Sequence, residues 1–128
     1  MQPDAASAPA ARTRPTRILL VDDHEISRAA LRALLRTEGL HVADVPPGAA
    51  AITAAVAFRP DVVIIDVTPA NPAGFLTACQ LRALPEAPLV VLTSSASRCR
   101  FGSQLERHPF IAKADLCARA IENTHPVG

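Results

Sequence analysis

The run from Asp61 to Asp66, DVVIID, constrains the fold of this chain more than any other stretch. Its four central residues are apolar and β-branched, which is typical of a strand buried on both faces. Such a strand needs a layer of structure on each side and therefore favours a parallel sheet covered by helices. The run ends on the carboxylate of Asp66, and a charge there is costly unless it has a function.

Four further short strands are predicted, over residues 18–21, 41–45, 89–93 and 109–113. Helical patterns separate them, over residues 24–38, 49–58, 72–84, about 104–108 and from 116 onward. The alternation predicts one α/β domain over residues 17–128, with a five-stranded parallel sheet and helices on both faces. Residues 1–16, rich in proline and alanine, are predicted to form a disordered arm.

Spacing along the chain predicts the faces and caps of several helices. The first helix carries apolar residues at helical spacing and a separate stripe of arginines: Ile26, Ala30, Leu34, Leu31 and Leu35 against Arg28, Arg32 and Arg36. The third helix is expected to bury Phe75, Leu76 and Cys79, with Asn71 near its start as a cap. Ser103 and Glu106 have capping-box spacing, and Asp115 is the predicted cap of the last helix.

Composition limits the classes of function. A net charge of +1 gives no electrostatic support for direct nucleic-acid binding, and no apolar run approaches the roughly 18 residues of a membrane span. The three cysteines, Cys79, Cys99 and Cys117, have no metal-type spacing, and we expect them to be buried thiols in a reducing cytoplasm.

Polar residues end four of the predicted strands: Asp22 and Asp23, then Asp66, Thr93 and Lys113. In open α/β sheets the binding crevice lies at the carboxyl ends of the strands, so we expect these side chains to converge. Three crowded carboxylates favour a hard divalent cation, above all Mg²⁺. Asp66 is then the best candidate for a nucleophile toward a phosphoryl group, with Lys113 and Thr93 placed to contact its oxygens. Taken singly each signal is weak, because an Asp-Asp pair after a strand is more often an ordinary helix N-terminal charge.

With these motifs, residues 17–124 resemble the receiver domain of two-component response regulators. The matching pieces are LVDDH at 20–24, ID at 65–66, Gly74, LTS at 92–94 and FIAK at 110–113. The resemblance implies a flavodoxin-like strand order of 2-1-3-4-5 and Mg²⁺-dependent capture of a phosphoryl group by Asp66. The donor would be a sensor histidine kinase or a phosphotransfer protein. The implied metal ligands are Asp23 and Asp66 directly, Asp22 through water, and the backbone carbonyl of Thr68.

The resemblance also implies a switch, in which Thr93 moves toward the phosphoryl group and Phe110 turns inward behind it. This would repack the face formed by the fourth helix, fifth strand and fifth helix, where a downstream protein partner or a second copy would bind. Phe110 is equally well explained as a core aromatic residue. Beyond self-phosphorylation and autodephosphorylation, no turnover is expected.

The sequence departs from the family pattern at three places. Ala70 stands where the family usually has proline, Ala114 follows Lys113 in place of a cis-proline, and the fourth helix is short and interrupted by Gly102. A cis bond before alanine costs roughly 2.5–4 kcal/mol, so this peptide is expected to be trans, with Lys113 held less firmly. These departures motivate an alternative, a degenerate receiver acting as a phosphorylation-independent interaction module. A third alternative, a Mg²⁺-dependent phosphohydrolase, would need a water-activating base for which the sequence offers no clear candidate.

Overall fold

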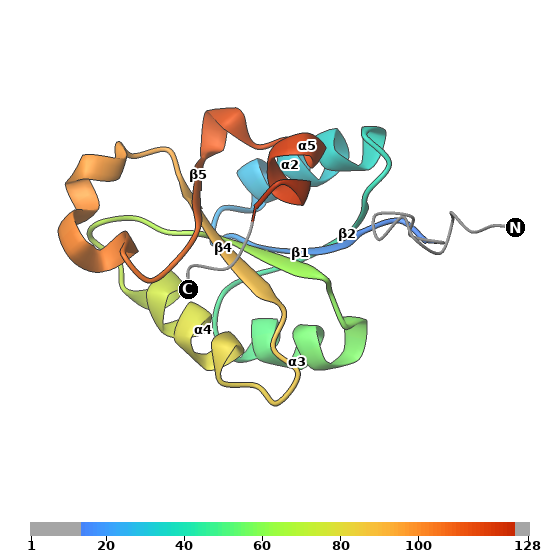
Figure 1. Cartoon of the computed structure of the whole chain (residues 1–128), viewed down its shortest axis with the longest axis horizontal. Coiled ribbons are helices and arrows are strands. Elements are labelled where there is room, and N and C mark those ends of the chain that lie inside the picture. Colours follow the sequence, from blue (N-terminus) through green and yellow to red (C-terminus); the bar gives the residue numbers. More distant parts are fainter. Residues whose placement is uncertain (1–13, 125–128) are drawn as a thin grey trace, which may run out of the picture.

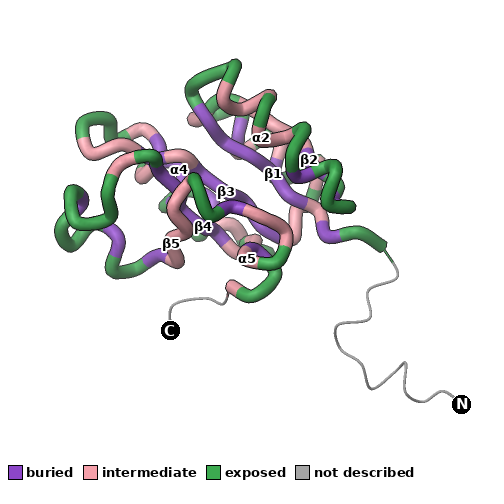
Figure 2. The backbone as a smooth tube through the Cα atoms, turned by 90° about the horizontal axis from the view of Figure 1, so that it is seen from above, coloured by how far each residue is buried: buried purple, intermediate pink, exposed green. Residues whose placement is uncertain are grey.

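A computed structural model describes residues 14–124 and shows one parallel sheet in the order β2-β1-β3-β4-β5 (Figure 1). Its strands are β1 (Arg17–Val21), β2 (His41–Val45), β3 (Val62–Asp66), β4 (Leu89–Ser94) and β5 (Phe110–Ala112). The predicted fold class is therefore confirmed, including the change of strand order between β1 and β3. Both strands lie at the centre of the sheet, where β3 is buried along nearly its whole length (Figure 2).

Helices cover both faces of the sheet (Figure 1). One face carries α2 (Glu25–Thr37) and α5 (Ala118–Glu122), and the other carries α3 (Ala49–Phe58) and α4 (Ala73–Arg82). Two 3₁₀ segments, η1 (Arg98–Leu105) and η2 (Lys113–Asp115), flank β5. The helices on the two faces form the two outer layers that the apolar strands require.

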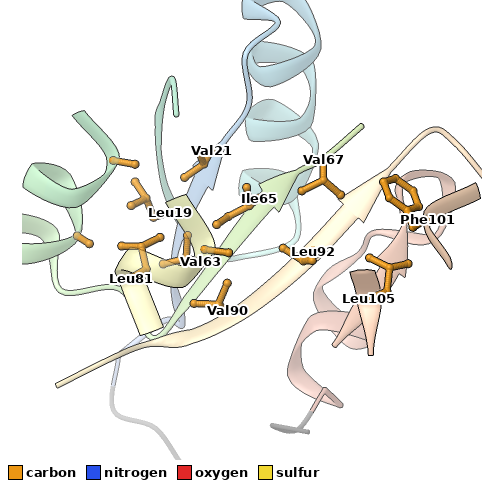
Figure 3. Packing of buried hydrophobic residues seen from close by; sticks show 13 residues of the cluster. Leu19, Val21, Val63, Ile65, Val67, Leu81, Val90, Leu92, Phe101 and Leu105 are labelled. Atoms are coloured by element: carbon orange, nitrogen blue, oxygen red, sulfur yellow. The ribbon is translucent and has the colours of Figure 1, made fainter. Parts of the chain in front are cut away.

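The side chains of the strands alternate between two cores. On β1, Leu19 and Val21 join the cluster under α3 and α4, which Figure 3 shows close up, whereas Ile18 and Leu20 join the cluster under α2 and α5. The same alternation runs along β3, because successive side chains of a strand point to opposite faces of the sheet. The strands are therefore held from both sides, and their carboxyl ends form a fixed edge.

Helix α2 packs on a different face from the one that hydrophobicity alone indicates. Leu35 is buried and Leu31 packs beside it, but Ile26 is 88% and Leu34 49% exposed. Arg28 and Arg32 instead turn toward β2, where both donate hydrogen bonds to the Asp44 carboxylate, at 2.8 and 2.6 Å. These hydrogen bonds to Asp44 on β2 therefore turn the arginine face of α2 toward the sheet.

The predicted interior of α4 was partly wrong, because Leu76 is 61% exposed and Cys79 is also exposed. The buried residues of this helix are Gly74, Thr77, Ala78 and Leu81, with Phe75 partly buried. Thr77 lies inside because its hydroxyl donates to the Ala73 carbonyl and accepts from the Gly48 N–H.

The predicted burial of all three cysteines was wrong as well, since Cys99 is exposed and Cys117 only half-buried. Cys117, and not Asp115, caps α5, because its sulfur accepts a hydrogen bond from the Ala120 N–H. Asp115 lies in η2 and is exposed. The segment before β5 is the 3₁₀ helix η1, which Gly102 kinks with a φ of 58°, and not a helix over 104–108.

The residues directly before β1 contact the rest of the domain. Arg14, within the predicted arm, forms an ion pair with Asp61 at 3.0 Å, and Thr16 is buried. The rest of the predicted arm, residues 1–13, lies outside the described residues. Within residues 14–124, no helix is long and apolar enough to cross a membrane.

Candidate functional site

The strand-end residues meet at one edge of the sheet. Asp66 ends β3 and stands in register with Thr93 on β4, while Asp22 directly follows β1 on the other side of β3. Lys113 follows β5 and reaches back across β4 to the two carboxylates. Parallel strand order thus converts positions far apart in the sequence into one cluster, as the spacing predicted.

Lys113 joins the two inner carboxylates of this cluster. Its Nζ lies 3.1 Å from Asp22 Oδ2 and 3.3 Å from Asp66 Oδ1. The three side chains are well shielded, with exposed fractions of 20% for Lys113, 5% for Asp22 and 9% for Asp66. The peptide bond after Lys113 is trans, as expected, and the ammonium group still contacts both carboxylates.

The environment of Asp66 disfavours its charged form. Burial is the main cause that raises the pKa of Asp66, and the nearby negative charge of Asp22 adds to it. The positive charges of Lys113 and His24 act in the opposite direction but do not cancel the effect. A further cation near Asp66 would therefore stabilise its ionised, nucleophilic form.

His24 also belongs to this site, although in the sequence it stands out only as part of the LVDDH motif. Its backbone N–H donates to Asp22 Oδ1 at 2.9 Å, and its Nδ1 lies 3.5 Å from the same oxygen. One ligand atom from each of Asp22, His24 and Asp66 lies within 4.8 Å of the others. The position of His24 directly after the Asp-Asp pair is the sequence signal that could have identified it as a site residue.

The remaining predicted metal ligands line an adjoining open cleft, which Asp23 and Thr68 share with Asp66 and His24. Asp23 is exposed and is not one of the three clustered ligands. Thr68 pairs with Asn71 through an isolated bridge, which closes the loop that contains Ala70. The N-cap of α4 is Pro72 and not the predicted Asn71, although Asn71 Oδ1 accepts a hydrogen bond from the Ala73 N–H at the start of the helix.

Thr93 presents a buried hydroxyl with an unused hydrogen-bonding capacity. Its Oγ1 is the one buried side-chain oxygen or nitrogen of the described residues that has no hydrogen-bond partner. The residue lines a small cavity together with Asp22 and Asp66. Because an unsatisfied buried hydroxyl is unfavourable, this group is suited to a polar ligand that enters from the Asp66 side.

Phe110, the predicted switch residue, lies on β5 and is partly buried. Its ring packs against Phe101 at 6.2 Å between centroids, and the guanidinium of Arg98 lies 5.4 Å from its centroid. Phe110 therefore contacts both the core and a cation at the surface, so that both of the predicted roles stay compatible with its position.

A second group of charged side chains, on α2 and β2, lies beside the site and holds the end of β1. Arg28 donates to the backbone carbonyl of Asp22 at 2.8 Å and to the Asp44 carboxylate, so it ties the end of β1 to β2. Burial alone would raise the pKa of Asp44, but the hydrogen bonds and charges of Arg32 and Arg28 lower it. No sequence pattern indicates this contact, because it depends on the register between β1 and β2.

The donor set fits a hard divalent cation. The carboxylates of Asp22 and Asp66 belong to the cluster, Asp23 and Thr68 line the adjoining cleft, and carboxylate and carbonyl oxygens are the donors that Mg²⁺ prefers. Asp22, Asp23 and Asp66, with the Thr68 carbonyl, are the residues that would hold it. A cation there would offset the negative charge that Lys113 only partly compensates.

Strand order and strand-end carboxylates together define a class, the doubly wound α/β domains that carry an acidic site where the strand order changes. The sequence profile of the response regulator receiver domain matches residues 18–114. The chain belongs to this family.

Relatives with curated functions are similar over part of their length. The transcriptional regulatory protein PdtaR of Mycobacterium tuberculosis is 34% identical over 85 residues, which cover 66% of this chain and 42% of PdtaR. The DNA-binding response regulator MtrA of Mycolicibacterium smegmatis is 37% identical over 82 residues, 64% of this chain and 36% of MtrA. The chain thus spans less than half the length of these relatives.

Solved structures share the fold. A CheY-like receiver domain from Methylobacillus flagellatus superposes with a TM-score of 0.69 at 24% identity, covering 84% of this chain and 93% of that one. The response regulator TrrA of Thermotoga maritima, solved with Mg²⁺-BeF, has a TM-score of 0.65 at 24% identity, covering 77% of this chain and 86% of that one. TrrA has also been solved in complex with the histidine kinase ThkA.

Proposed function

We propose that this chain is a phosphoacceptor receiver of a two-component system, acting in the cytoplasm. Asp66 takes a phosphoryl group from the phosphohistidine of a sensor kinase or phosphotransfer protein. The observation that carries the proposal is the convergence of Asp22, Asp66 and Lys113 beside the unpartnered hydroxyl of Thr93, in a member of the receiver family. The complex of TrrA with a histidine kinase supports a partner of that class.

The reaction is a displacement at phosphorus. A carboxylate oxygen of Asp66 forms a bond to phosphorus while the bond from phosphorus to the histidine nitrogen breaks, and the leaving imidazole keeps the electron pair. Lys113 orients Asp66 and supplies positive charge, and Thr93 is placed to donate its hydroxyl to a phosphoryl oxygen. Bound Mg²⁺ would neutralise charge on the carboxylates and the phosphoryl oxygens.

The proposed consequence of phosphorylation is a change at the surface around β5. Phe110 lies on β5 beside β4, one register position from the residue paired with Thr93, and its ring would turn inward when Thr93 moves toward the phosphoryl group. A downstream protein or a second copy of the chain would recognise the altered surface. A degenerate, phosphorylation-independent module is less well supported, because Lys113 contacts both carboxylates despite the neighbouring Ala114.

The test is acid-labile phosphorylation of the purified protein by acetyl phosphate with Mg²⁺, followed by intact mass and hydroxylamine sensitivity. Wild type is expected to gain one phosphoryl group, whereas Asp66→Asn gains none. Asp115→Asn is the matched control, because it makes the same change at an exposed aspartate outside the cluster. Equal labelling of wild type and Asp66→Asn, or no labelling of either, would refute the proposal.

A further inference from the structure

The cation site contains a nitrogen donor that the oxygen ligands of a magnesium site do not require. His24 Nδ1 lies 3.5 Å from Asp22 Oδ1, and the two residues form, together with Asp66, a group in which one ligand atom from each lies within 4.8 Å of the others. Ligand bonds of about 2.1 Å place the ligands of one ion roughly 3–4 Å apart. The three side chains therefore need only small rotations to bind a single ion.

The arrangement also leaves the side of the cluster that carries His24 accessible to an ion. Lys113 contacts Oδ2 of Asp22, whereas His24 faces Oδ1 of the same carboxylate. The backbone N–H of His24 is bonded to Oδ1 as well, which fixes the start of its side chain beside the carboxylate. A cation bound between Oδ1 and the imidazole would thus not have to displace the lysine from Oδ2. The imidazole is 70% exposed and accessible from solvent.

We propose that His24 supplies an imidazole nitrogen to the divalent cation held by Asp22 and Asp66, so that the site favours first-row transition-metal ions over Mg²⁺. The proposal rests on the proposed function in that it assigns a further ligand to the same cation site. Imidazole is a good ligand for cobalt, nickel and zinc, whereas Mg²⁺ binds almost only oxygen and retains water. One histidine in an otherwise oxygen-lined site therefore changes the order of metal affinities.

The ligand is tested with Mn²⁺ as a spectroscopic probe bound to the full chain. Electron spin echo envelope modulation is expected to show coupling to a ¹⁴N nucleus in wild type, and His24→Gln abolishes it. His41→Gln is the matched control, because His41 is exposed on β2 and does not belong to the ligand group. This variant keeps the ¹⁴N coupling.

Selectivity is tested by calorimetric titration of the same proteins with Co²⁺ and with Mg²⁺. His24→Gln is expected to weaken Co²⁺ binding by at least about tenfold and to change Mg²⁺ binding little. Mn²⁺ bound in wild type without ¹⁴N coupling, or an equal loss of both metals in His24→Gln, overturns the inference but leaves the carboxylate site intact. Metal binding unaffected by Asp66→Asn overturns it as well, because the ion then lies elsewhere. Phosphorylation of Asp66 by acetyl phosphate is read out separately, so the proposed function can stand when this inference fails.

Discussion

At the scale of single residues, the hydroxyl of Thr93 connects stability to ligand binding. It is buried beside Asp66 and has no hydrogen-bond partner, so it destabilises the unmodified protein by the cost of removing a hydroxyl from water. Under the proposed function, the same hydroxyl would become favourable once a phosphoryl oxygen lies within reach. A single side chain would then favour the phosphorylated state over the unmodified one.

Thr93→Val tests this idea, because valine has nearly the same shape and no hydroxyl. We expect the unmodified variant to be more stable than wild type by about 1 kcal/mol, measured by urea denaturation. Beryllofluoride with Mg²⁺, which stands in for the phosphoryl group, should stabilise the variant less than wild type. A variant that is less stable than wild type without the ligand would show that Thr93 has a partner in solution.

At the scale of elements, the pairing of α2 with β2 rests on charge as well as on apolar packing. Asp44 accepts from two arginines of α2, and one of them also holds the carbonyl of Asp22. The Arg28 side chain is only 16% exposed, so removing the carboxylate leaves a shielded cation without its partner. The position of a site residue therefore depends on an ion pair one strand away.

Asp44→Asn is expected to destabilise the protein by about 1–3 kcal/mol at neutral pH. Because the arginines lower the pKa of Asp44 in the folded state, its contribution is present above the unfolded pKa, near 4, and is lost as the pH falls through the lower folded value. Chemical denaturation between neutral and acidic pH should show the two proteins converging at low pH. If the difference in stability between wild type and Asp44→Asn does not depend on pH, the loss arises from side-chain packing and not from the charge of Asp44.

The limits of sequence reasoning are also seen at this scale. The strands were predicted within a residue or two, because β-branched runs such as 62–65 have few alternatives. The faces of the helices were predicted less well. Thr77 is buried through hydrogen bonds to Gly48 and Ala73, while Leu76 next to it is exposed. Hydrophobicity cannot reveal such rotations, since they depend on polar partners brought together only by the fold.

For the candidate site, the sequence indicated that Asp22, Asp66, Thr93 and Lys113 meet at one edge of the sheet, but it did not indicate that Asp23 is exposed and lies outside the cluster. It was insufficient for His24 and Arg28, whose roles depend on side-chain direction and on contacts with the Asp22 carboxylate and carbonyl. The order of the strands was available only through the family resemblance. Spacing along the chain shows which residues lie at the edge formed by the carboxyl ends of the strands. It does not show which of their side chains point toward the cluster.

At the scale of the whole molecule, the raised pKa of Asp66 makes global stability depend on pH. Above the unfolded pKa of a carboxyl group, near 4, the fold disfavours the ionised form, so stability falls as the pH rises through the higher folded value. Without divalent cations, Asp66→Asn should therefore unfold at a higher temperature than wild type at neutral pH, and this advantage should shrink as the pH falls toward 4.

Calorimetric melting curves over this pH range, with and without Mg²⁺, measure the effect. Mg²⁺ should stabilise wild type more than Asp66→Asn, because the proposed cation site includes that carboxylate and a ligand of the folded state stabilises it. Asp115→Asn, at an exposed position, serves again as the control and should follow wild type. If the melting temperatures of wild type and Asp66→Asn change with pH in the same way, burial of the ionised Asp66 carboxylate does not lower the stability of the folded protein.

Lys113 is the only lysine among the 128 residues, and it lies between two shielded carboxylates. Amine-directed reagents therefore have one side-chain target in the chain, and that target is inside the site. Acylation would remove the positive charge between Asp22 and Asp66, so labelling intended for surface attachment would instead inactivate the cluster. The same property makes the acylation rate of this single lysine side chain, followed apart from that of the α-amino group, a reporter of how open the site is, without any introduced probe.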